Sequence, residues 1–110
     1  MIKDRIVRIK LKKNFHEQKP LSYVGKVTAF QDNRVVIDAK CIMLCRSEKT
    51  GVQIDPKTSA MMIPVSGIES IRVLPDSFDM NDIRITTQGQ QLCMVVDQAL
   101  DAFIGEMGEG

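Results

Sequence analysis

The stretch that decides the fold runs from residue 61 to residue 75 and reads MMIPVSGIESIRVLP. Two short apolar runs lie on either side of a break that contains one proline and one glycine. Proline cannot donate to a sheet ladder, and glycine tolerates the backbone conformations that tight turns need. The pattern predicts two strands joined by a very short turn, with too little polar alternation for a solvent-facing edge.

Upstream of this stretch, a first strand is predicted over residues 5–11. Val7, Ile9 and Leu11 alternate there with two cations, as in a strand with one buried face. The isoleucines of this segment also fit a helical period, but its β-branched content favours a strand. A polar loop that contains a proline follows over residues 14–22.

Two longer strands are predicted next. Residues 23–30 form the second strand, with Gly25 at a bend or at a close approach of another backbone. Asp32 and Asn33 are a two-residue hairpin signal, and they lead into a third strand that runs from residue 34 to about Cys45. A polar loop over residues 46–59 then precedes the two strands of the opening stretch. The chain is therefore expected to be mainly β, with five strands in a strongly bent open barrel.

The C-terminal part is predicted to form an amphipathic α-helix over residues 88–107. Apolar residues recur there at spacings of three and four, the stripe of a helix with one buried face: Leu92, Val95, Val96, Ala99, Leu100, Phe103, Ile104 and Met107. An isolated helix of this length is marginal in water. We therefore expect Leu92, Val96, Leu100 and Phe103 to dock on a barrel, either their own or a neighbour's. The alternative is a loose tail that binds a separate partner.

Charge is unevenly distributed along the chain. The formal net charge is +1, yet residues 1–19 are rich in lysine and arginine, and residues 75–110 carry seven acidic residues against Arg84. A basic N-terminal segment could attract phosphate groups. It could also be a solvated strand face, or it could attract the acidic tail of a neighbouring subunit.

No group of residues points to catalysis or metal binding. His16 is the one histidine, and the three cysteines, Cys41, Cys45 and Cys93, show no Cys-x-x-Cys spacing, so we interpret two of them as small core residues. Ser66-Gly67 lacks the surroundings of a nucleophile turn. We expect no enzyme activity, no cofactor, no metal and no small-molecule substrate. Without an apolar run near the roughly 18 residues of a membrane span, we expect a cytoplasmic protein with no membrane partner.

Residues 5–74 resemble the Sm-like family of small β-barrels, which includes the eukaryotic Sm proteins and the bacterial RNA chaperone Hfq. Its first motif resembles the segment Gly25–Phe30, a turn, and Val35–Ala39. Its second motif resembles Met62-Ile63, a turn, and Ile68–Ile71. The resemblance implies a barrel domain over residues 1–75, followed by a C-terminal extension over residues 76–110.

The resemblance also implies a homo-oligomeric ring, in which strand four of one subunit pairs with strand five of the next. Such pairing satisfies the free backbone groups of an open barrel and closes without a filament. The residues that would form this interface are Met61, Met62, Ile63, Ile68, Ile71 and Val73. The alternative is an ordinary buried hairpin in a monomer.

RNA is the partner that the resemblance implies, although the family's pocket residues differ here. The family's Asp-x-hydrophobic-Asn loop and Arg-Gly turn are replaced by residues 31–34 and by Pro64-Val65. We therefore expect phosphate contacts rather than base readout, from Lys12, Lys13, Lys19, Lys26 and Arg34, with Asn33 able to add hydrogen bonds. The expected function is a non-enzymatic, ring-forming protein that binds RNA or ribonucleoprotein partners. The alternative is a protein-interaction or scaffolding module that uses the barrel without specific RNA binding.

Overall fold

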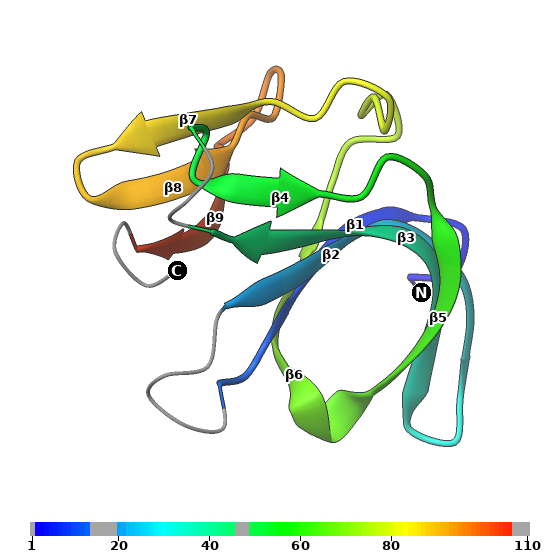
Figure 1. Ribbon diagram of the computed structural model, residues 1–110. Coiled ribbons are helices and arrows are strands. Elements are labelled where there is room, and N and C mark those ends of the chain that lie inside the picture. The colour runs from blue at the N-terminus through cyan, green and yellow to red at the C-terminus, as the bar shows by residue number, and fades with distance from the viewer. Residues whose placement is uncertain (1, 14–19, 46–48, 107–110) are drawn as a thin grey trace.

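The computed structural model describes residues 2–13, 20–45 and 49–106. Two antiparallel sheets make up the fold (Figure 1). The elements are β1 (Ile6–Leu11), β2 (Leu21–Gln31), β3 (Arg34–Leu44), β4 (Val52–Ile54), β5 (Ser59–Pro64), η1 (Val65–Gly67), β6 (Ile68–Val73), β7 (Ile85–Gln88), β8 (Gln91–Met94) and β9 (Ala102–Glu106). The larger sheet has the order β4-β3-β2-β1-β6, with β5 also paired to β3, and the smaller sheet has the order β7-β8-β9. The predicted mainly β class is confirmed.

The predicted hairpin between β2 and β3 is present, and both strands are eleven residues long. Asp32 and Asn33 have φ values of 52° and 58°, the left-handed conformation that a tight two-residue turn requires. Gly25 lies directly opposite Ala39. A Cβ atom on Gly25 would lie 2.6 Å from the Ala39 Cα, so the close approach predicted for this glycine is confirmed.

β3 has two partners along its other edge. Its first half pairs with β5 and its last three residues pair with β4. Asp55 lies between the two: its N–H donates to the Cys41 carbonyl oxygen at 3.1 Å, and its Oδ2 accepts from the Cys41 N–H at 3.0 Å. The prediction of an uninterrupted loop over 46–59 was wrong, because Val52–Ile54 extends the sheet there.

The two strands predicted around residues 64–67 are confirmed as β5 and β6, with the 3-10 turn η1 between them. β6 returns to β1, where Val73 lies opposite Val7. Because β5 pairs only with β3 and β6 only with β1 in the described part of the chain, each keeps one free edge. The larger sheet is therefore curved but not closed.

Two apolar cores lie on the two faces of this curved sheet. The inner core consists of Val7, Ile9, Val27, Val35, Ile37, Ala39 and Ile63. The outer core lies between the larger and the smaller sheet and consists of Val24, Ile42, Leu44, Val52, Leu74, Leu92, Met94, Val96, Ala102 and Ile104. The smaller sheet thus contributes four of these ten residues, and Figure 1 shows it beside β4 at the upper left.

The predicted C-terminal helix was wrong. Residues 85–106 form β7, β8 and β9, so the described residues form nine strands instead of the predicted five. Leu92 and Val96 are buried as expected, but Leu100 is 82% exposed. The helical spacing arose by chance, because three consecutive residues of β8 are buried and the other described apolar residues are divided between the loop after it and β9. The C-terminal residues pack on the larger sheet as strands and not as a helix.

The first strand is correct, but both of its faces are covered. Val7 and Ile9 point into the inner core, while Arg8 and Lys10 are buried on the outer side. Lys10 Nζ lies 2.9 Å from the Glu69 carboxylate and 5.7 Å from the centre of the Phe103 ring of β9. The alternation of apolar and charged residues in β1 therefore corresponds to two buried faces, and not to one buried and one solvated face.

Candidate nucleic-acid interface

One end of the larger sheet is organised around η1, at the lower edge of Figure 1. The Val65 N–H donates to the Asn33 carbonyl oxygen at 2.9 Å, which ties the turn to the tip of the β2–β3 hairpin. The Lys12 N–H donates to the Gly67 carbonyl oxygen, also at 2.9 Å, which ties it to the end of β1. Residues far apart in the sequence are therefore held side by side at this end, which we call the η1 end.

Four of the six predicted RNA-binding residues lie at the η1 end. Asn33 and Arg34 lie on one side of the turn and are exposed, and Lys12 lies on the other side with Lys13 next to it. The guanidinium Nη1 of Arg34 lies 3.8 Å from the Met62 sulfur, a weak acceptor that leaves the charge open to solvent. A row of cations on a solvent-facing edge is suited to phosphate groups.

The two other predicted residues are not part of this group. Lys26 is exposed on β2 but lies opposite Ile6 and Asp38, several residues away from the hairpin tip. Lys19 lies outside the described residues. The basic N-terminal segment is thus divided by the fold, because Arg8 and Lys10 face the smaller sheet and only the end of β1 reaches η1.

Sequence reasoning assigned Met62 to a subunit interface and did not predict that Phe30 and Val65 are exposed at this end. Phe30 is 54% exposed and Met62 is 55% exposed, and Val65 on η1 is exposed as well. An exposed aromatic ring is a platform on which a base can stack. The available signal was the position of Phe30 two residues before the Asp32-Asn33 turn, in the part of β2 that extends beyond its pairing with β1.

The residues predicted to form a subunit interface fall on the two free-edged strands. Met61, Met62 and Ile63 belong to β5, and the other three belong to β6. Ile71 and Val73 lie opposite the fully buried Ile9 and Val7, yet both are exposed. They point toward the inner face at a free edge, where no further strand of the described chain covers them. Ile63, by contrast, is already part of the inner core.

Arg8, a cation on the strand next to β6, has a shifted pKa. Burial lowers the pKa of Arg8, and the charge of Arg72 directly opposite lowers it further, while Glu69 acts in the other direction. Arg8 Nη1 donates to the Ser70 hydroxyl at 3.0 Å, and its buried Nε has no hydrogen-bond partner. This guanidinium is enclosed between the sheets and is not accessible to a phosphate.

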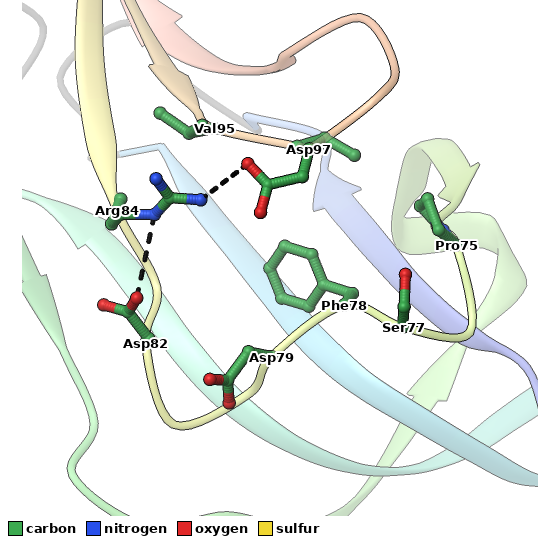
Figure 2. Close-up of a pocket in the computed structure, with 9 residues that line it drawn as sticks. Pro75, Ser77, Phe78, Asp79, Asp82, Arg84, Val95 and Asp97 are labelled. Atoms are coloured by element: carbon green, nitrogen blue, oxygen red, sulfur yellow. Dashed lines mark hydrogen bonds and ion pairs between the residues drawn. The ribbon is translucent and has the colours of Figure 1, made fainter.

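A pocket of about 140 Å³ lies elsewhere, between the 75–84 segment and the end of β8 (Figure 2). Arg84 lies at its edge, 2.8 Å from an Asp97 oxygen and 3.8 Å from an Asp82 oxygen. The hydrogen bond to Asp97 raises the pKa of the Arg84 guanidinium, followed by the charges of Asp97 and Asp82. With Asp79 also present, the lining carries more negative than positive charge, so a phosphate would be repelled there.

No three histidine, cysteine or acidic side chains among the described residues are grouped so as to hold a metal ion. No helix in that part of the chain is long and apolar enough to cross a membrane. No family model, curated protein or solved structure matches the chain.

Proposed function

We propose that the protein is a non-enzymatic, Sm-like protein that assembles with itself through β5 and β6 and binds single-stranded RNA at the η1 end. The strand order supports this proposal. β1, β2 and β3 follow one another in the sheet, and β6 returns to β1 after a three-residue 3-10 turn. This is the arrangement that the Sm-like resemblance implies, with β4 and β5 together in the place of strand four.

The observation that carries RNA binding is the pair of hydrogen bonds that η1 makes, to Asn33 on one side and to Lys12 on the other. These bonds place Arg34 and two lysines around one rigid turn. An exposed ring, Phe30, lies in the same hairpin. Cations that contact phosphates and a ring on which a base stacks are the two parts of a sequence-tolerant single-strand site.

The test is fluorescence anisotropy with short U-rich and A-rich RNA across a salt series. We expect affinity to fall steeply as salt rises, with a slope of about 0.7 per phosphate contact on logarithmic axes, and little difference between the two sequences. Lys12→Glu and Arg34→Glu should each weaken binding. Lys57→Glu is the matched control, because Lys57 is exposed in the 55–58 segment and outside the η1 end.

Binding that is insensitive to salt, or equal loss in the Lys57→Glu control, would contradict the η1 end as an RNA site. A second candidate function is a protein-interaction module, which is favoured by the exposed apolar side chains of Phe30, Met62 and Val65. Absence of RNA binding at low salt in a chain that still self-associates would favour this second function.

A further inference from the structure

Residues 97–101, in the loop between β8 and β9, hold the most exposed large apolar side chain of the described residues. Leu100 is 82% exposed, although the loop around it is fixed by side-chain contacts. Asp101 accepts from the Val96 N–H at 3.1 Å and from Gln88 Nε2 at 2.9 Å. A fixed loop that presents a leucine to solvent loses little conformational freedom when it binds.

This loop lies against β6, one of the two strands with a free edge. Arg72 of β6 donates from Nη2 to the Leu100 carbonyl oxygen at 2.6 Å and from Nη1 to the Asp101 carbonyl oxygen at 3.4 Å. Arg72 lies opposite Arg8, on the outer side of the larger sheet. Leu100 is therefore anchored on the outer side, beside the free edge of β6.

The free edge of β5 carries a matching side chain. Met62 lies opposite Val36, whose neighbours Val35 and Ile37 point into the inner core. Because side chains alternate along a strand, Met62 points to the outer side, where it is 55% exposed. If β5 of a second copy extended the sheet at β6, Met62 of that copy would lie on the same side as Leu100.

The inner-side residues of β6 and the charge of Glu69 are also consistent with the addition of β5 from a second copy. Ile71 and Val73 of β6 are exposed on the inner side, where Met61 and Ile63 of an added β5 would also point. An antiparallel addition, the mode of every strand pair in the described sheets, places the Pro64 end of the added β5 beside the Ile68 end of β6. Glu69, which is 53% exposed at that end and forms an ion pair with Lys10 of its own chain, would then face the end of the added copy that carries Arg34, opposite Pro64.

We propose that the 97–101 loop is part of the subunit interface, and that Leu100 packs on Met62 of a second copy of this chain. The inference rests on the proposed self-assembly through β5 and β6 and adds a contact from the smaller sheet. The interface is head-to-tail, because each copy offers Leu100 at one edge and Met62 at the other. A loop outside the larger sheet would then control how tightly the copies associate.

The test compares Leu100→Asp and Met62→Asp with a control, Gln90→Asp, which places the same charge at an exposed position of the β7–β8 turn. Analytical ultracentrifugation across a wide range of concentration gives the dissociation constant. We expect each of the first two variants to raise it on the order of thirtyfold or more, and the control to leave it unchanged. Thermal unfolding of all three variants checks that each is folded.

Mixing the two single variants gives the sharper result. Leu100→Asp keeps an intact Met62 edge, and Met62→Asp keeps an intact Leu100 edge, so a head-to-tail interface should give a one-to-one dimer that grows no further. A wild-type chain that stays monomeric overturns both this inference and the proposed self-assembly. A wild-type oligomer that Leu100→Asp leaves as stable as Gln90→Asp does, or a mixture that stays monomeric, overturns this inference alone.

Discussion

Gly25 and Ala39 lie opposite each other across β2 and β3, so close that no side chain fits on Gly25. Gly25→Ala would press a methyl group onto the backbone of β3, and overpacking of this kind costs roughly 3 kcal/mol. Urea unfolding should show that loss. Gly67→Ala is the control, because a Cβ atom there meets no atom within 4 Å, and a similar loss for both variants would contradict the explanation.

The Asp32-Asn33 turn depends on the left-handed backbone of Asn33, whose φ is 58°. A β-branched residue is strained in that conformation, by about 1–2 kcal/mol. Asn33→Val should therefore lower the free energy of unfolding by that amount, and Asn33→Gly should leave it unchanged or raise it slightly. Equal stability of the two variants would mean that the turn adopts another conformation.

The difference in burial between Leu92 and Leu100 distinguishes the observed strands from the predicted helix. In a helix of the predicted spacing both leucines would dock, whereas Leu92 is buried here and Leu100 is exposed. Leu92→Ala should cost about 3 kcal/mol, as for other buried leucines, and Leu100→Ala less than about 0.5 kcal/mol. Both variants should be unfolded in urea at concentrations below those of self-association, because assembly would add to the apparent stability of the wild type.

Stability should fall at alkaline pH because of the pair formed by Tyr23 and Cys41, which lie opposite each other in β2 and β3. Burial raises the pKa of the Cys41 thiol above its ordinary 9.0, and the nearby Asp55 carboxylate adds to the shift. Burial also raises the pKa of Tyr23, followed by the effects of Cys41 and Asp55.

The unfolded chain therefore loses these protons at a lower pH than the folded chain. The resulting stabilisation is fully present below pH 9.0, the ordinary pKa of the thiol, and is lost as the pH rises through the folded value. Under reducing conditions, the free energy of unfolding should decline less steeply above that pH in Cys41→Ala than in the wild type. Parallel curves for the two proteins would contradict this assignment.

Local signals in the sequence predicted five of the six strands in the N-terminal two thirds of the chain, all except β4. Asp32-Asn33, Gly25 and the Pro64–Gly67 break each impose a backbone geometry that few residues tolerate, so each could be located without knowledge of its neighbours. Arg8 and Lys10 could not be placed in the same way. Their burial depends on the smaller sheet, whose position on the outer face no local pattern encodes.

The C-terminal strands were missed for a related reason. β8 is buried on both faces, so it shows no alternation, and its residues happened to match the spacing of a helix. Gly89, with φ of 62° in the two-residue connection between β7 and β8, was the signal that could have revealed the hairpin. At the candidate site, Asn33 and Arg34 could be named from the sequence. Their proximity to Lys12 could not, because it arises from the two hydrogen bonds of η1.

The return of β6 to β1 has a consequence for how the chain acquires its structure. Arg8 and Ser70, which are joined by a hydrogen bond between those strands, lie 62 positions apart in the sequence. One edge of β1 can pair early with β2, but its other edge must wait during synthesis until most of the chain, including β6, has left the ribosome. Pairings over such distances fold slowly, and an unpaired β1 edge invites aggregation meanwhile. Arg8 and Lys10 place two charges on that strand, and charges on an open edge oppose its pairing with other chains.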